Sequence, residues 1–263
     1  MRWPERRSRP HGAGRRPYAC VSRVIVGLAA LALIVSGACR GDDPASPQAA
    51  GATAAPATPT YVGRATCASC HRDQDERFRG SHHDLAMQAA DARTVLGDFG
   101  GATFTYAGTT SRFTRQGDRF VVRTDGPDGQ LKDYDVAYVF GVHPLQQYLI
   151  AFPDGRYQAL GIAWDARPKA AGGQRWFHLY EHDRIVHGDP LHWTQFSQNW
   201  NAQCAVCHST RLRKGYDRTA DRYATTWAEL DVSCEACHGP GSAHAAWAAG
   251  RRCIAERPDR VAA

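Results

Sequence analysis

The motif Cys-x-x-Cys-His occurs three times in this 263-residue chain, and no other feature constrains the fold as strongly. The composition alone would give only about 0.014 such motifs by chance. The motif is typical of covalent haem attachment. We therefore expect three attachment sites, with thioether-forming cysteines at Cys67, Cys70, Cys204, Cys207, Cys234 and Cys237 and proximal iron ligands at His71, His208 and His238.

The chemistry of haem attachment explains this spacing. Two thiols add across the two vinyl groups of one haem, and the histidine that follows lies under the ring and ligates the iron. A covalently held haem needs little enclosing pocket, so a small chain is able to hold several. The motifs therefore predict three haems c in a mixed, mainly α-helical and irregular multihaem cytochrome c fold.

Zinc and disulfides are the two alternative uses of these cysteines. A zinc ribbon formed by the second and third motifs would have 26 residues between its cysteine pairs, more than the usual 15–20. It would also leave the first motif and three histidines unexplained. Disulfides suit an exported chain, but they do not require a histidine after each second cysteine. Haem attachment therefore explains the pattern best.

The first 38 residues have the features of an export signal. Seven arginines lie in residues 1–23, and an uncharged apolar run of 15 residues follows at 24–38, whereas a membrane-spanning helix needs about 20. A basic region, a short apolar region and small residues before a cleavage point are typical of a signal peptide. We therefore expect a signal peptide at 1–38 and export to the periplasm or the outer face of a bacterial membrane.

Cys39 directly follows the small residues that end the signal, as in bacterial lipoproteins. Two interpretations remain open: a lipid on Cys39 that associates the chain with a membrane, and ordinary cleavage near Ala38. Residues 39–60 are rich in Ala, Pro and Thr, a composition that cannot form a core. We expect a flexible linker there, a multihaem domain at 61–250 and a tail at 251–263.

The net charge of +6 comes from the signal segment, because residues 39–263 hold 25 basic and 25 acidic side chains. A neutral mature chain lacks the basic surface that nucleic-acid binding requires. We therefore expect no nucleic-acid partner.

Eight histidines remain once the proximal ligands and the signal segment are set aside, and multihaem cytochromes often use a second histidine on each iron. The neighbouring residues favour His83, His192 and His244 as candidate distal ligands, with His178 as a weaker candidate. For each of them the alternative is an ordinary surface or core histidine. Met87 would raise the potential if it ligated iron, but packing as an apolar side chain is the favoured interpretation.

A β-rich segment is expected between the first and second motifs. Aromatic and apolar residues alternate with others between positions 134 and 164, a period that indicates strands. Glycine- and proline-containing sequences at 124–129 and 153–155 indicate turns. We place the segment at about 100–164, with helices at 73–92, carrying His83, and at 226–237, carrying the third motif.

Several segments resemble a known family. The first motif and the third motif with its Gly-Pro-Gly-x-x-His continuation to His244 are similar to the tetrahaem cytochrome domain of ammonia-oxidising bacteria. Residues 144–148, 152–155, 174–178 and 191–193 resemble exported cytochromes of this type that continue into tetratricopeptide repeats. The resemblance runs from about residue 61 to about residue 247. It implies electron transfer among closely packed haems, and it supports His83 and His244 as iron ligands.

Two departures from the family pattern matter. The family usually has a fourth haem motif, whereas this chain has three. Longer relatives continue beyond the position of His244, whereas here a polar tail follows in which Cys253 is not followed by a second cysteine or a histidine. Truncation or a frameshift is one explanation, and the full haem set stays open.

Three functions compete. The leading hypothesis is a periplasmic or membrane-tethered electron carrier with three haems c, largely ligated by two histidines each, that exchanges electrons with other redox proteins. The alternative is a haem oxidoreductase with one open iron site that acts on a small nitrogen or sulfur compound. A non-redox docking module built on the β-rich segment ranks last. No catalytic residue or small-molecule substrate is indicated, so we favour a carrier over an enzyme.

Overall fold

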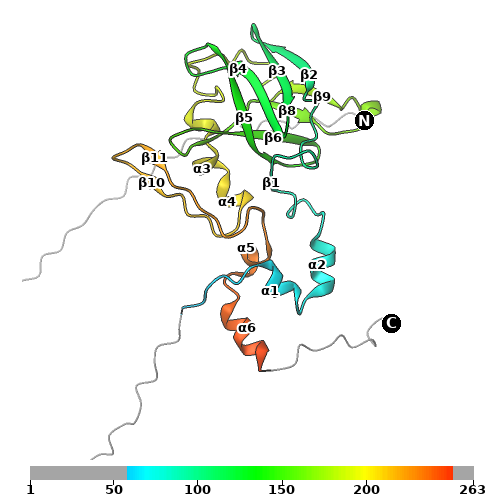
Figure 1. Ribbon diagram of the computed structural model, residues 1–263, viewed down its shortest axis with the longest axis vertical. Coiled ribbons are helices and arrows are strands. Elements are labelled where there is room, and N and C mark those ends of the chain that lie inside the picture. The colour runs from blue at the N-terminus through cyan, green and yellow to red at the C-terminus, as the bar shows by residue number, and fades with distance from the viewer. Residues whose placement is uncertain (1–57, 251–263) are drawn as a thin grey trace, which may run out of the picture. The chain divides into compact units, whose positions relative to one another are not determined.

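Strands make up most of the regular structure in the computed structural model, which describes residues 58–250 (Figure 1). The strands are β1 (Met87–Ala89), β2 (Gly100–Tyr106), β3 (Thr109–Gln116), β4 (Arg119–Asp125), β5 (Leu131–Phe140), β6 (Leu145–Ala151), β7 (Tyr157–Ala159), β8 (Ile162–Asp165), β9 (Arg175–His178), β10 (Tyr216–Asp217) and β11 (Arg222–Tyr223). The short helices are α1 (Arg64–Ala68), α2 (Arg72–Phe78), α3 (Trp200–Gln203), α4 (Ala205–His208), α5 (Cys234–His238) and α6 (Ser242–Ala249), with 3₁₀ turns η1 (Lys169–Ala171) and η2 (Phe196–Gln198).

The expectation of a mainly α-helical and irregular fold is therefore wrong. Within the described part of the chain, nine strands form one antiparallel sheet that nearly closes into a barrel. The sheet begins at β1 and ends at β9, so it extends beyond the expected 100–164 at both ends. The physical reason is that the β-branched and aromatic hairpins bury a core of their own, whereas helices as short as those at the motifs are marginal without tertiary support.

Consecutive hairpins give the sheet the order β2-β3-β4-β5-β6-β8-β9, with β1 paired to β5 and β7 paired to β6. Both turns expected from the glycine- and proline-containing sequences are confirmed. The N–H of Gly126 donates to Gln130 O at 2.9 Å, and the N–H of Gly155 donates to Phe152 O at 3.0 Å. Gly155 has a φ of 79°, a left-handed conformation that favours glycine and makes the tight β6–β7 connection.

An aromatic core fills the inside of the sheet. Phe113 lies opposite Val122 in the β3–β4 pair and is fully buried. Its ring stacks on Trp176 of β9 with centroids 3.6 Å apart, and Phe99 meets both rings edge-on at 5.6 and 5.5 Å. These contacts join the two outer regions of the sheet.

The outer strands β2 and β9 also approach each other through Tyr106 and His178, whose rings stack at 3.6 Å. The hydroxyl of Tyr106 lies 3.0 Å from Tyr180 O and 2.6 Å from Asp183 O, and it accepts a hydrogen bond from the N–H of Ile185 at 3.1 Å. Tyr106 therefore fixes the loop after β9 to the end of β2.

A second apolar cluster joins the sheet to the second motif. Met87 of β1 and Phe140 of β5 pack there against Trp200 and Ala205, which flank Cys204. Met87 is 1% exposed, so its side chain is a core contact of β1.

Two expected helices are wrong over most of their length. Helix α2 ends at Phe78, Gly80 adopts a φ of 71°, and His83 lies in a turn before β1. In the segment expected as a helix at 226–237, only its final residues, in α5, are helical. The earlier ones pair with the chain after the second motif; for example, the N–H of Ala228 donates to Thr210 O at 2.8 Å. In the first segment, a left-handed glycine interrupts the predicted helix. In the second, pairing with a remote part of the chain takes the place of helical hydrogen bonds.

The expected signal peptide, almost all of the linker, the lipid site at Cys39 and the tail at 251–263 lie outside the described residues. Among the helices of residues 58–250, none combines the length and the apolar character needed to cross a membrane.

Candidate haem-attachment sites

The first and third motifs lie together. Helix α1 carries Cys67 and α5 carries Cys234, and both cysteines line one cavity. Burial, reinforced by the neighbouring Cys234, raises the pKa of the Cys67 thiol. The first cysteine of one motif therefore lies close to the first cysteine of the other.

Thioether formation needs thiols. Within the described residues, five of the six motif cysteines are free, namely Cys67, Cys204, Cys207, Cys234 and Cys237. Cys70 takes part in a disulfide.

A cavity of about 380 Å³ lies beside the first motif. Its lining includes Cys67, Cys70, His71 and His244, the last from α6. The rings of His71 and His244 have centroids 6.1 Å apart and planes inclined by 22°. Two imidazoles that ligate one metal ion from opposite sides at metal–nitrogen distances of about 2 Å would have centroids roughly 6 Å apart. The centroid separation is therefore that of two axial ligands of one iron, but the rings lie stacked, so ligation would require each ring to turn a nitrogen toward the iron.

A second cavity, of about 220 Å³, lies beside the third motif. Its lining includes Cys234, Cys237, His238 and His83, together with His71 of the first motif. The N–H of Val232 donates to the carbonyl oxygen of His83 at 3.3 Å, which fixes the His83 turn against the segment that leads into α5. The structure thus brings one candidate distal histidine to each of these two motifs.

The second motif packs against the sheet. The Nδ1 atom of His208 lies 3.0 Å from the carbonyl oxygen of Ala86, and Phe140 meets the ring edge-on at 5.4 Å. A backbone carbonyl accepts a hydrogen bond only from a protonated Nδ1, so Nε2 of the neutral ring keeps its lone pair. Metal-ligating histidines commonly donate their other N–H in this way. The ring of His208 therefore keeps its Nε2 atom available to bind a metal ion.

Thr210 connects the second motif to the third. Its hydroxyl donates to Asp231 O at 2.8 Å and accepts from the N–H of Ser233 at 2.8 Å. Its own N–H donates to Glu229 O at 3.0 Å. These bonds hold the segment before Cys234 against the segment after His208.

Arg64 holds the His83 turn against the first motif. Its guanidinium contacts Asp75 of α2 at 2.6 Å and Asp84 at 2.5 Å, and it lies 4.5 Å from the centre of the Phe78 ring. Asp84 also accepts from the N–H of Gly80 at 2.7 Å. One cation therefore joins α1, α2 and the turn that presents His83.

Asp231 predicts a pH-dependent contribution to stability. Burial and the carboxylates of Glu229 and Asp84 raise its pKa from 3.8 to about 6. The folded state therefore binds this proton more tightly than the unfolded state, and the resulting stability is present below about pH 4 and lost as the pH rises through about 6. We expect Asp231→Asn to raise the free energy of unfolding at pH 7.5 by about 1 kcal/mol, discounted for solvent screening, and by less at pH 5.

Thermal unfolding of the wild type and the variant at both pH values measures this difference. An equal effect at the two pH values would contradict it. Asp217→Asn, at an exposed position in β10, is the control and should change neither value.

Glu235, between the cysteines of the third motif, is a residue that the sequence analysis did not single out. Its side chain is buried, and it accepts hydrogen bonds from the backbone N–H groups of Val62, Gly63 and Gly241. Although burial favours the neutral acid, the hydrogen bonds from Gly241, Val62 and Gly63 lower the pKa of Glu235. The sequence signal for Glu235 was its position between the two cysteines of the third motif. No neighbouring residue, however, indicated its hydrogen-bond partners.

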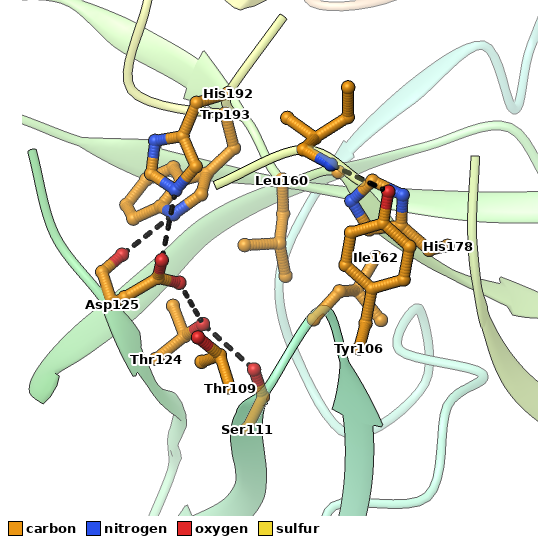
Figure 2. Close-up of a pocket in the computed structure, with 12 residues that line it drawn as sticks. Tyr106, Thr109, Ser111, Thr124, Asp125, Leu160, Ile162, His178, His192 and Trp193 are labelled. Carbon is orange, nitrogen blue, oxygen red and sulfur yellow. Dashed lines mark hydrogen bonds and ion pairs between the residues drawn. The ribbon is translucent and has the colours of Figure 1, made fainter. Parts of the chain in front are cut away.

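The structure does not bring His178 and His192 to a motif. Both are buried and line a cavity of about 30 Å³ in the sheet (Figure 2). His192 Nε2 lies 3.2 Å from an Asp125 oxygen and its Nδ1 lies 2.8 Å from Thr194 Oγ1. His178 Nδ1 accepts from the N–H of Tyr180, and burial lowers the pKa of His178 to about 4. These partners make both residues part of the polar interior of the sheet.

The donor groups fit haem better than a bare metal ion. No group of three or more His, Cys, Asp or Glu side chains within residues 58–250 is arranged to hold a metal ion, as a zinc ribbon would require. Haem iron takes four ligands from its own ring and needs only one or two from protein. In the same part of the chain, the buried polar side-chain atoms without a partner are Trp200 Nε1, Glu229 Oε2 and Ser233 Oγ, all within five residues before a motif. Such atoms normally have partners, which a bound group with its waters would supply.

Comparison with known proteins agrees with this chemistry. The family model described as cytochrome c554 and c-prime matches residues 175–239, which include the second and third motifs. The match supports a relationship to c-type cytochromes and to electron transport. No curated protein and no solved structure matches the chain. The resemblance to the tetrahaem form and to relatives that continue into tetratricopeptide repeats stays an expectation from the sequence.

Proposed function

We propose that this protein is an exported electron carrier that holds three haems c. The family match over the second and third motifs supports the cytochrome c relationship, and the three motifs in the sequence support the number. Haem iron supplies reversible one-electron exchange when it is bound. The six motif cysteines hold the haems, and His71, His208 and His238 are their proximal ligands.

The observation that carries the proposal is the pair His71 and His244, with ring centroids 6.1 Å apart beside the first motif. A second histidine closes the far side of an iron to substrates. His83 lines the cavity of the third motif and would serve there in the same way. Two-histidine ligation also favours potentials toward the low end of haem proteins, because methionine ligation is what raises them.

The spacing of the motifs supports exchange between the irons. Cys67 of the first motif and Cys234 of the third line one cavity, and the second motif is joined to the third through Thr210. The described chain therefore holds three attachment peptides against one another, as a carrier that passes electrons internally requires. Other redox proteins are the proposed partners, and the periplasm or an outer membrane face, with or without a lipid on Cys39, is the proposed location.

One observation favours the second candidate, a haem oxidoreductase with one open iron that acts on a small nitrogen or sulfur compound. The contacts of His208 in the described residues are with Ala86 and Phe140, and neither His178 nor His192 lies beside this motif. An iron held there without a second histidine would be open to a small molecule.

Carbon monoxide binding to the reduced, natively matured protein separates the two candidates. The carrier predicts low-spin haems and no carbon monoxide bound. One carbon monoxide per chain, with a high-spin signal, would support the oxidoreductase instead. A protein without haem would contradict both.

A further inference from the structure

Glu235 lies on the third motif, yet its hydrogen-bond donors begin the two helices beside the cavity of the first motif: Val62 and Gly63 lie at the start of α1, and Gly241 lies at the start of α6. Its two carboxylate oxygens accept from Val62 N at 3.0 Å, from Gly63 N at 2.7 Å and from Gly241 N at 2.7 Å. The side chain is 2% exposed, so these bonds are shielded from water. Burying a carboxylate without hydrogen-bond donors would destabilise the folded protein. The three donors therefore stabilise Glu235 in this position.

The three donors stand at the entrances of two helices. Gly63 is the N-cap of α1, which carries Cys67, and Gly241 is the N-cap of α6, which carries His244. One carboxylate therefore fixes the beginning of the helix on the proximal side of the first cavity and the beginning of the helix on its distal side. A second link, from Thr60 to Ser242 at 2.7 Å, runs between the same two segments on the surface.

We propose that Glu235 is a positioning residue for the first haem, which sets His244 opposite His71. The inference rests on the proposed function, because it assigns the first iron two histidines. Glu235 acts through the backbone of α1 and α6 and does not touch the iron. A residue of the third motif thereby controls the sixth ligand of the first.

The test uses the natively matured protein with Glu235→Ala and Glu235→Gln. Removing an outer group that orients a metal ligand commonly weakens ligation by about 10- to 100-fold. We expect Glu235→Ala to bind about one more carbon monoxide per chain than the wild type, and Glu235→Gln, which keeps one acceptor oxygen, to bind less than that. The haem content should stay at the wild-type value.

Two further variants make the result specific. Adding Glu235→Ala to His244→Ala should bind no more carbon monoxide than His244→Ala alone, since both act on one ligand. Gly241→Ala keeps the carboxylate but places a methyl group 3.2 Å from its Oε1 atom and 3.1 Å from Val62 Cγ2. The φ of Gly241 is −84°, a conformation that alanine tolerates. We therefore expect Gly241→Ala to bind more carbon monoxide than the wild type but less than Glu235→Ala.

Asp165→Asn is the matched control, because Asp165 is a buried carboxylate, 4% exposed, that is paired with Arg167 in the sheet. It should leave carbon monoxide binding unchanged. Wild-type carbon monoxide binding in folded Glu235→Ala and Gly241→Ala would overturn the inference, as would the loss of one haem from Glu235→Gln, which would assign Glu235 to attachment at its own motif. A wild type without haem would instead overturn the proposed function.

Discussion

Replacing His244 by alanine is expected to open one iron per chain to carbon monoxide, beyond any that the wild type binds. The ring of His244 faces His71 at a centroid distance of 6.1 Å, and the described lining of this cavity offers no other histidine. The position of His244 on that iron would then hold a weak ligand or none. The measurement is carbon monoxide titration of the reduced protein, with the high-spin fraction of the oxidised protein as a second readout.

His182→Ala is the control, because His182 is exposed and lies in the loop after β9. It should leave both readouts at the wild-type values. If His244→Ala also stays entirely low-spin and binds no additional carbon monoxide, another residue ligates the first iron and the pairing of His71 with His244 is wrong.

Phe113→Ala is expected to destabilise the sheet by about 3–5 kcal/mol. Phe113 is fully buried, and its ring stacks on Trp176 at 3.6 Å and meets Phe99 edge-on. Truncation would remove these contacts and leave a cavity that the surrounding strands fill only partly. Denaturant unfolding followed by circular dichroism measures the loss, provided that the slope of the transition is unchanged.

Leu131→Ala, at a residue 44% exposed at the start of β5, is the matched control and should change the free energy of unfolding by no more than about 0.5 kcal/mol. A loss below about 1 kcal/mol for Phe113→Ala would show that its site relaxes freely, contrary to the packing described. Since Phe113 contacts no motif residue in its cluster, the haem spectrum of the folded variant should match the wild type.

The features that were readable from the sequence are those encoded by neighbouring residues. The Cys-x-x-Cys-His spacing reflects covalent chemistry within five residues, and the turns at Gly126 and Gly155 reflect local backbone requirements. The alternation between positions 134 and 164 correctly indicated strands. The overall balance between helix and strand was misjudged, because the helices expected at 73–92 and 226–237 form over only a small part of their length. The sheet also recruits β1 and β9, whose sequences are too short to show a period.

The distal side of the candidate sites depends on contacts between remote segments. His83, His244 and His192 had similar local support, yet the first two line motif cavities and His192 lies in the sheet with Asp125. The partners of Glu235 are more than 170 residues away or across a glycine loop. Periodicity in the sequence does not predict such contacts, because they are set by the tertiary packing of α1, α5 and α6.

The most direct test of the account is the intact mass of the mature chain purified from a host that exports it and attaches haem. The account predicts the mass of the processed polypeptide plus three haems, retained under denaturing conditions, with haem-bearing peptides that map to residues 67–71, 204–208 and 234–238. A coloured sample that loses its haem on denaturation, or a mass equal to the bare processed polypeptide, would contradict it.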